Sequence, residues 1–395
     1  MIRDMKDLDI AIVGAGIAGL TAARALQTFG FRVRVYEQAS RLGEVGAGLT
    51  ISPNATHVLN AIGLEGVLER IGMRPTRGGV KHWRTGELLV EIPRGQDMLA
   101  RYGAAYYQVH RADLHAALAE AIQAHDPEAI VLGRCFESLL DDGQRVQLRF
   151  TGGASANAAV AIGADGLRSN VRQTLFGAQQ PKFTGYIAYR GLVPVSRLPA
   201  GIINPTSCLS TGPGRSFTRY LLRGGTLVNF VGLCERHDWA EEGWSIRSTV
   251  EELLAEFEGW TPWVLRFMEQ VPPELLFKWG LFDREPLTRW SQGRATLLGD
   301  AAHPVLPFLG HGAVLAIEDG VVLGRAIAAS TSIEEALQRY EKARLERAAF
   351  VVHESRKAGK QYHVPDADSY GQRTGNKPAD EGIGLFSYNP VTQVI

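Results

Sequence analysis

The chain of 395 residues has few cysteines and no excess of charge of either sign. Its three cysteines, Cys135, Cys208 and Cys234, stand 26 or more positions apart, and none belongs to a C-x-x-C pair. This spacing argues against a disulfide scaffold, a structural zinc, an iron–sulfur cluster and a dithiol redox centre, so no metal site is expected. The 42 basic and 42 acidic side chains cancel, so no global field favours a nucleic acid or an anionic membrane as partner.

Long apolar runs are missing as well. The apolar segment 11–20 contains three glycines and is followed by Thr21 and Arg24, whereas a membrane-spanning helix needs about 18 apolar residues or more. Four of the first seven residues are charged, and the apolar core and cleavage site of a signal peptide are absent. These patterns predict a cytoplasmic protein that does not contact a membrane.

Glycine is the residue type in excess: it occupies 44 of the 395 positions, whereas its usual share is ~7% of a chain. The apolar run 9–13 predicts a strand, and a helical pattern that ends at Gly30 begins a few residues later. Between the two, three glycines have the spacing G-x-G-x-x-G: Gly14, Gly16 and Gly19. The next segment, 32–37, alternates as a strand does and ends on an acid, Glu37.

Each part of this strand–turn–helix–strand unit has a physical task in binding a dinucleotide. Gly14 makes the tight turn, Gly16 lets the backbone approach a pyrophosphate, and Gly19 lets the helix pack on the strand. The phosphates are favoured at the helix N-terminus by its N–H groups and dipole, and Glu37 can accept a hydrogen bond from a ribose hydroxyl. The unit predicts a dinucleotide with a free ribose diol, and by itself it does not distinguish NAD from FAD.

The rest of the chain alternates between helical and strand patterns. Helices are predicted over residues 112–124, 250–257, 263–268, 312–328 and 333–360, and strands over 131–132, 146–150, 158–163, 186–193, 217–222, 226–231 and 295–298. Between 182 and 233, short strand patterns separated by glycine and proline turns predict an antiparallel sheet that forms its own layer. The tail 364–395 is predicted to be an irregular arm. Only one dinucleotide-binding unit is visible, which argues against flavin disulfide reductases and Baeyer–Villiger enzymes.

Further motifs decide which dinucleotide is expected. They are Gly46-Ala47-Gly48 with Ser52-Pro53-Asn54, His110-Arg111-Ala112-Asp113-Leu114, the segment from Gly163 to Arg172, Gly299-Asp300-Ala301-Ala302-His303-Pro304, and Gly310-His311-Gly312-Ala313 with Ile317-Glu318-Asp319-Gly320. In this order, over residues 8 to about 345, the chain resembles the single-component FAD-dependent aromatic hydroxylases. The nearest branch is that of salicylate hydroxylase, 3-hydroxybenzoate 6-hydroxylase and 6-hydroxynicotinate 3-monooxygenase. The resemblance implies FAD as cofactor and NADH or NADPH as co-substrate.

The resemblance also implies roles for individual residues around the cofactor. FAD contacts would come from the glycine motif and from Glu37, Arg41, Gly48, Arg111, Asp165, Asp300, Gly310, Gly312 and Ala313. Arg111 would reach the phosphates, and Asp300 would hold a ribityl or phosphate hydroxyl. Asp165 would support the junction between two domains and the nicotinamide path. An N-cap role for Asp300 and a turn-forming role for Asp165 stay open as alternatives.

Two segments are expected along the flavin ring. Pro304 and the backbone of residues 310–313 would lie there, and the N–H groups of a helix beginning near Gly312 can stabilise negative charge on the reduced flavin. His311 stands where the branch usually has glutamine, so a polar contact near the flavin can titrate in the physiological range. His303 is expected to support the loop rather than act as a base.

The substrate-facing positions depart from the branch. Thr50 and Phe308 replace histidines of the hydroxynicotinate enzymes, which counts against a pyridine substrate held by the same contacts. Tyr220 falls at a substrate-facing tyrosine, although a packed strand position is an equal alternative. Ser216 replaces a histidine four positions earlier, so the usual phenol-activating pair is incomplete. Arg190 is a candidate partner for a substrate carboxylate, as are Arg84, Arg215 and Arg219, and each can instead be a surface or structural arginine.

The resemblance implies an α/β fold like that of p-hydroxybenzoate hydroxylase. A Rossmann-like FAD-binding domain would be formed by residues 1–75, 105–180 and 280–345, an inserted antiparallel-sheet substrate domain by 76–104 and 181–279, and a C-terminal helix end and arm by 346–395. The implied reaction uses NAD(P)H and O₂ to hydroxylate a phenol or hydroxylated aromatic acid, salicylate- or hydroxybenzoate-like, through a flavin C4a-hydroperoxide. The alternatives are a hydroxypyridine carboxylate substrate such as 6-hydroxynicotinate, or a flavin reductase or dehydrogenase on the same fold. A monomer or homodimer is expected.

Overall fold

The predicted dinucleotide-binding unit is the centre of the first sheet. The computed structural model describes the chain except for residues 1–7, 44–46, 237, 239–245, 364–365 and 371–381. Strand β1 (Asp9–Val13), helix α1 (Ile17–Thr28) and strand β2 (Arg32–Tyr36) follow one another as the sequence predicts. The sheet has the order β19-β20-β12-β1-β2-β8, with parallel pairing throughout except for the hairpin of β19 and β20. The remaining strands are β8 (Ile130–Val131), β12 (Val160–Gly163), β19 (Ser291–Gln292) and β20 (Ala295–Leu297).

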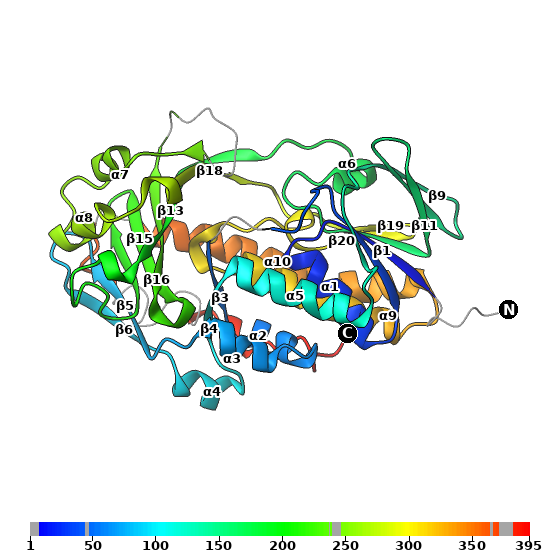
Figure 1. Ribbon diagram of the computed structural model, residues 1–395, viewed down its shortest axis with the longest axis horizontal. Helices are drawn as coiled ribbons and strands as arrows, with labels where there is room; N and C mark the ends of the chain where they lie inside the picture. The colour runs from blue at the N-terminus through cyan, green and yellow to red at the C-terminus, as the bar shows by residue number, and fades with distance from the viewer. Residues whose placement is uncertain (1–7, 44–46, 237, 239–245, 364–365, 371–381) are drawn as a thin grey trace.

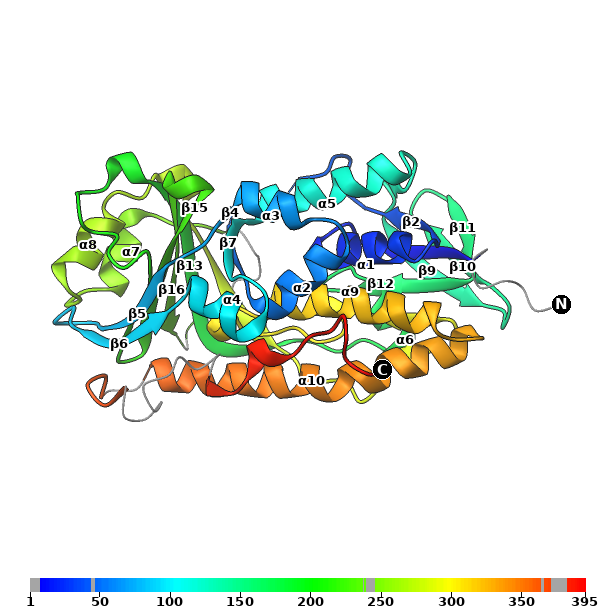
Figure 2. The same cartoon turned by 90° about the horizontal axis from the view of Figure 1, so that it is seen from below.

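Long helices accompany this sheet. Helix α1 packs against α5 (Arg111–His125) and α9 (Gly312–Ala328), and α9 in turn packs against α10 (Ile333–Tyr362). Figure 2 shows α10 extending from the six-stranded sheet to the second, larger sheet. None of the helices in the described part of the chain is both long enough and apolar enough to cross a membrane.

The second sheet has eight strands in the order β17-β18-β13-β16-β15-β14-β5-β6. Their bounds are β5 (Arg77–His82), β6 (Leu88–Pro93), β13 (Lys182–Pro194), β14 (Ser207–Gly212), β15 (Arg215–Leu222), β16 (Leu227–Glu235), β17 (Ile246–Arg247) and β18 (Phe277–Asp283). The strands within residues 182–233 pair antiparallel, as predicted, whereas β5, from the earlier segment 76–104, pairs parallel with β14. Strands β5 and β6 form a hairpin, which comes from a much earlier stretch of the chain than the other strands. It extends the sheet at its edge, as Figure 1 shows.

The two faces of the larger sheet have different partners because side chains alternate along each strand. On one face, Tyr189, Phe217 and Phe230 pack against α7 (Val250–Glu256) and α8 (Pro262–Met268) in an apolar core. On the other face, apolar side chains of the sheet pack toward the segment around Phe308 and toward α10. This second face is therefore the one that faces the glycine-rich unit, which consists of β1, α1, β2 and the glycine turn between β1 and α1.

Two three-stranded sheets and further short helices complete the part of the fold that the structure describes. Strands β3 (Gly48–Ile51), β7 (Tyr107–His110) and β4 (Gly72–Met73) form one three-stranded sheet, and β9 (Phe136–Asp141), β10 (Val146–Phe150) and β11 (Ser155–Ala158) form another. The short helices are α2 (Pro53–Ala61), α3 (Glu65–Ile71), α4 (Gln96–Tyr102) and α6 (Asn170–Phe176). The last described segment, 382–395, buries Leu385 and Phe386, and Pro390 accepts a hydrogen bond from Arg325 at 2.7 Å.

A buried ionic cluster joins α9 to α10. Arg344, which is fully buried, pairs with Glu318 at 2.7 Å and with Asp319 at 2.8 Å, and Arg347 adds a second cation to Glu318 at 2.7 Å. His303 bonds Asp319 through Nε2. Burial by itself would raise the pKa of Asp319, but the charges of His303 and Arg344 outweigh it and lower that pKa to about 2.

Candidate active site

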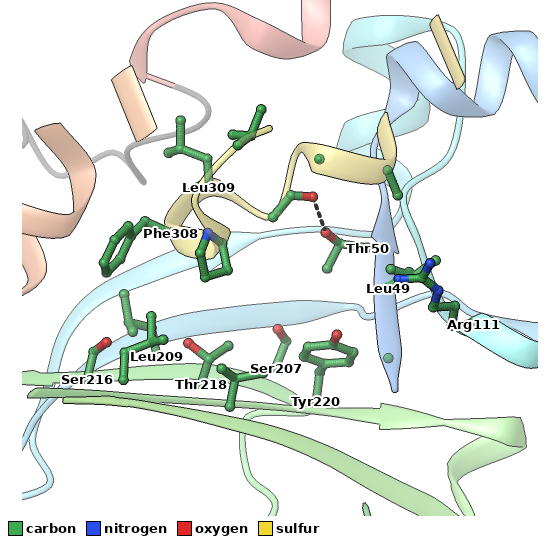
Figure 3. A pocket seen from close by; sticks show the side chains of 18 of the residues that line it. Leu49, Thr50, Arg111, Ser207, Leu209, Ser216, Thr218, Tyr220, Phe308 and Leu309 are labelled. Atoms are coloured by element: carbon green, nitrogen blue, oxygen red, sulfur yellow. Dashed lines mark hydrogen bonds between the residues drawn. The ribbon is translucent and has the colours of Figure 1, made fainter. Parts of the chain in front are cut away.

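A cavity of about 440 Å³ lies between the glycine-rich unit and the larger sheet. Figure 3 shows Ser216, Thr218 and Tyr220 pointing from the sheet toward Thr50 and the segment of Phe308. The opposite wall is made by the start of α1 and by residues that precede and begin α9. Thr50 closes part of this wall, since its hydroxyl donates to the carbonyl of Gly310 at 3.2 Å.

The glycine motif has the geometry that its spacing predicts. Gly14 has a φ of +104°, and a Cβ there would lie 2.5 Å from the carbonyl oxygen of Ala164. A Cβ on Gly19 would lie 2.0 Å from the carbonyl oxygen of Gly14. At Gly16, which lines the cavity and caps the N-terminus of α1, a Cβ would instead project into open space. Gly14 and Gly19 are required by packing inside the protein, while Gly16 leaves room for a ligand.

Glu37 lies beside this loop, immediately after β2. One of its carboxylate oxygens accepts the N–H of Ala15 at 2.8 Å, and the other accepts the N–H of Ala39 at 2.8 Å. These bonds fix the carboxylate next to the glycine motif and leave lone pairs for a further donor. Arg41 is exposed and is not among the residues that line the cavity, so its predicted cofactor contact stays a prediction.

Arg111 and Gly48 line the cavity beside the glycine motif. Arg111 is the first residue of α5, and its N–H donates to the carbonyl of Ala47 at 2.8 Å. The N–H of Gly48 donates to the side chain of Asn229 at 2.7 Å, and a Cβ on Gly48 would lie 2.5 Å from the ring of Tyr220. The strand β3 therefore crosses the sheet closely enough to require glycine at position 48.

Asp300 and the N-terminus of α9 complete this wall. Asp300 lies in a short 3₁₀ turn (Gly299–Ala301) that Leu298 caps, so the alternative N-cap role is wrong, and burial raises the pKa of its carboxyl. Gly310 has a φ of +67°, which favours glycine, and it lines the cavity together with Gly312 and Ala313. Backbone N–H groups in the first turn of α9 have no partner within the helix, so this end suits an electron-rich group.

Asp165 and His303 make their described contacts within the protein. The Asp165 carboxylate accepts the hydroxyl of Ser169 and the N–H of Val171 at 3.1 Å, which secures the start of α6. Its neighbours Ala164 and Gly166 line the cavity, whereas Asp165 does not. The turn-forming alternative for Asp165 thus describes its contacts, and a direct cofactor role stays a prediction. His303 pairs with buried Asp319, as the supporting role expected for it requires.

His311 and Pro304 were also predicted to be catalytic, next to the flavin ring. Unlike Tyr220, neither of them lines the first cavity. His311 is buried, its Nδ1 lies 2.7 Å from the carbonyl oxygen of Leu309, and its ring stacks on Phe386. It lines neither described cavity, so a contact with the flavin stays a prediction. Pro304 lines a second cavity of about 420 Å³. The two cavities share a wall made by Asp300, Val305 and Pro307.

Of the predicted substrate residues, three line the first cavity and one does not. Tyr220, Thr50 and Phe308 line it, and burial raises the pKa of the Tyr220 hydroxyl. Arg190 instead places its guanidinium over the ring of Trp279, 4.9 Å from the centroid. The other candidate arginines, Arg84, Arg215 and Arg219, do not line the cavity either.

One arginine that lines the first cavity, Arg94, was not predicted from the sequence. Arg94 follows β6, is largely buried and lines the cavity. Its guanidinium lies over the rings of Tyr106, at 4.5 Å, and Phe386, at 5.4 Å. Its sequence signal is weak: an arginine directly after a short run of alternating residues. Tyr106, Ser207 and Thr218 also line the cavity and were not predicted.

The cavity wall suits FAD by its own chemistry. Gly16 with open space beside it, the cation of Arg111 and the helix N-terminus at Gly312 line the cavity, and the carboxylate of Glu37 is held beside the glycine motif by its bond to Ala15. They correspond to the needs of a pyrophosphate, a ribose and an electron-poor ring system.

Comparison with known proteins agrees with this geometry. A family model described as "FAD binding domain" matches residues 7–355. A 3-amino-4-hydroxybenzoate 2-monooxygenase of Streptomyces platensis is 38% identical to the chain, with 96% of this chain and 94% of the relative covered. The chain belongs to the FAD-dependent aromatic monooxygenases. A 6-hydroxynicotinate 3-monooxygenase of Pseudomonas fluorescens is 37% identical over 87% of this chain and 89% of the relative.

A solved structure shares the fold of this monooxygenase. The crystal structure of Klebsiella pneumoniae HpxO with FAD and uric acid superposes with a TM-score of 0.85 at 26% identity, covering 96% of each chain. The predicted α/β fold, the FAD cofactor and the NAD(P)H co-substrate are confirmed for the family to which the enzyme belongs.

Proposed function

We propose that this monooxygenase hydroxylates a small hydroxylated aromatic acid whose carboxylate pairs with Arg94. Arg94 carries the proposal, because it and Arg111 are the two cations among the described residues that line the first cavity, and Arg111 starts the helix beside the glycine motif. A guanidinium matches the two oxygens of a carboxylate, and pairing is stronger where burial removes water. The relatives named above act, by their names, on an aminohydroxybenzoate and on a hydroxynicotinate, both of which are aromatic acids.

The remaining lining residues would orient the ring and keep it dry. When bound, FAD supplies the redox chemistry that draws electrons from NAD(P)H and activates O₂ for insertion into the ring. Leu209, Val231 and Leu233 present apolar side chains from the sheet, and Phe308 covers them from the opposite wall. Tyr220 keeps its proton at neutral pH, because burial raises its pKa, and can therefore donate to a substrate oxygen. Exclusion of water and a fixed orientation of the ring both favour transfer of oxygen to the substrate over its release as hydrogen peroxide.

A hydroxypyridine carboxylate remains the alternative substrate class. Arg94 could hold its carboxylate equally well, but the side chains near the ring differ from those expected for such a substrate. Thr50 offers only a hydroxyl that already donates to Gly310, and Phe308 offers no polar atom. A benzenoid acid therefore suits the site better than a hydroxypyridine carboxylate, whose ring nitrogen needs a hydrogen-bond partner.

Turnover of a substrate panel tests this function. Hydroxylated benzoates, matched phenols without a carboxylate and hydroxypyridine carboxylates are compared by O₂ uptake, NAD(P)H consumption and product mass. We expect one O₂ and one NAD(P)H consumed per hydroxylated benzoate, with Arg94→Gln losing about 10- to 100-fold in kcat/KM, the worth of one charge-assisted hydrogen bond. Arg101→Gln, a change at an exposed arginine of α4, should leave turnover unchanged.

The contrary outcomes are distinct. Anaerobic oxidation of NAD(P)H with an organic acceptor and no hydroxylated product would favour the reductase alternative. Equal loss for the carboxylate-free phenols in Arg94→Gln would remove Arg94 from carboxylate recognition.

A further inference from the structure

The cavity reaches a buried histidine through a serine of the sheet. Ser216 shares the cavity-facing side of β15 with Thr218 and Tyr220, as Figure 3 shows, and it is 1% exposed. Its hydroxyl oxygen lies 3.0 Å from Nε2 of His363. A hydroxyl offers one donor and two acceptor sites, so Ser216 can bond His363 and still accept from a group in the cavity.

His363 comes from a distant part of the chain, one residue beyond the end of α10. It does not line the cavity, and its ring contacts the rings of Tyr186 and Phe308 at 5.1 Å and 5.6 Å between centroids. The side chain is almost fully enclosed, and Nδ1 has no hydrogen-bond partner among the described residues. A buried ring nitrogen left in this way is uncommon and points to a functional position.

The second nitrogen of His363 faces a route to solvent. Nδ1 lies 3.8 Å from a carboxylate oxygen of Glu235 on β16, whose side chain is 42% exposed. This distance exceeds a hydrogen bond and can be spanned by a bridging water or a small movement of the exposed carboxylate. Tyr186 on β13, which is titratable, also faces the ring, and its hydroxyl donates to Glu235 at 3.2 Å. Burial raises the pKa of Tyr186 to about 12, so it stays neutral.

We propose that Ser216 and His363 form a proton relay that carries the phenolic proton of the substrate from the cavity to Glu235 and solvent. This inference rests on the proposed function. As the substrate O–H bond breaks, its proton passes to the Ser216 oxygen, and the Ser216 proton passes to Nε2 of His363. The proton on Nδ1 then leaves toward Glu235, so the substrate becomes a phenolate and every group in the relay stays neutral. The reverse sequence returns one proton when the product leaves as a phenol.

The environment of His363 suits passing a proton on rather than holding it. Burial lowers the pKa of His363 to about 3, so the ring is neutral at working pH, with one nitrogen able to accept while the other donates. A phenolate is far more electron-rich than a phenol, and electrophilic oxygen insertion needs that electron density at the ring. The relay also accounts for serine at position 216: the histidine expected there is replaced by a hydroxyl that bonds His363, just beyond α10.

Two variants test the relay without removing the fold of the site. Ser216→Ala deletes the hydroxyl. His363→Gln keeps a polar group near the same place, but an amide cannot accept a proton at one end while it releases a proton at the other. Ser216→Thr keeps the hydroxyl and serves as the conservative rescue, and His353→Asn, an exposed position of α10, is the outside control. FAD content and the dissociation constant of the aromatic acid, measured by flavin absorbance, show that each variant is assembled.

The readout is the pH dependence of turnover with phenols of different acidity. For a hydroxybenzoate whose phenol ionises near ~10, we expect Ser216→Ala and His363→Gln to lose about a hundredfold in kcat at neutral pH, and Ser216→Thr to retain most of it. With a nitro-substituted hydroxybenzoate, already a phenolate at neutral pH, the loss should disappear in both variants. A similar loss with both substrates, or full activity of Ser216→Ala with the weakly acidic phenol, would overturn the relay. Failure of the wild type to hydroxylate any aromatic acid would instead refute the proposed function.

Discussion

Among the described residues that line the cavity, positive charge comes from two arginines, of which one could be predicted from the sequence and one could not. Arg111 lies in a recognisable motif at the start of α5, so its place beside the glycine loop could be predicted. Arg94 could not, because its place depends on how β6 pairs at the edge of the larger sheet and on packing over Tyr106. Local pattern identifies residues that follow a strand and turn, whereas contacts between segments far apart in the chain leave no local signal. His363 is missed for the same reason, since it meets Ser216 across 147 positions.

Arg111 should determine FAD affinity. Arg111→Ala is expected to purify with less FAD and to bind added FAD about 10- to 100-fold more weakly, because the cation that we predict to pair with a phosphate is lost. Fluorescence titration of the stripped protein measures this, with the exposed Arg145→Ala as control. A variant as yellow as the wild type would refute the phosphate role of Arg111.

At the scale of elements, strands and helices with strong periodicity agree with prediction. β1 and α9 have the predicted bounds, and α10 continues two residues further than expected, to Tyr362. The strands β5, β6 and β14 were not predicted, because β5 contains two glycines, β14 contains three small polar residues, and the alternating run of β6 is short. Their place in the sheet is fixed by neighbours, which supply the hydrogen bonds and the cover that the local sequence does not specify.

The crossing of β3 over the larger sheet should depend on Gly48. Gly48→Ala places a Cβ 2.5 Å from the Tyr220 ring and 2.8 Å from Asn229, so β3 must move or Tyr220 must turn away. We expect a loss of about 1–3 kcal/mol in unfolding free energy, the usual cost of overpacking, together with weaker FAD binding. Gly43→Ala is the matched control, because its Cβ would meet nothing within 4 Å. Urea unfolding of both variants decides the matter, and equal stabilities would contradict the close crossing.

For the whole molecule, the ionic cluster between α9 and α10 links the glycine-rich unit to the long helix that extends to the larger sheet (Figure 2). The motif around Glu318 and Asp319 was found in the sequence, but its partners on α10 were not, because an arginine on a charged helix resembles any surface arginine. Burial distinguishes them, since Arg344 is fully enclosed.

Arg344→Leu should therefore destabilise the enzyme strongly. Removing the cation leaves two buried carboxylates poorly compensated, at a cost of about 3–5 kcal/mol, whereas Arg339→Ala, which breaks an exposed pair on the same helix, should cost about 0.5 kcal/mol or less. The pKa of Asp319 is lowered in the folded state, so its stabilising contribution is full above about pH 4 and is lost as the pH falls toward 2. Urea unfolding from neutral to acidic pH measures both effects, and a mild loss in Arg344→Leu would contradict them.

We propose that this enzyme inserts oxygen from O₂ into an aromatic acid held in the cavity beside Arg94. The decisive measurement is turnover of a hydroxybenzoate under isotopically labelled O₂, followed by mass spectrometry of the product. We expect one labelled oxygen atom per product molecule and per NAD(P)H oxidised. A product without label, or NAD(P)H oxidation that yields only hydrogen peroxide with every aromatic acid tried, would contradict it.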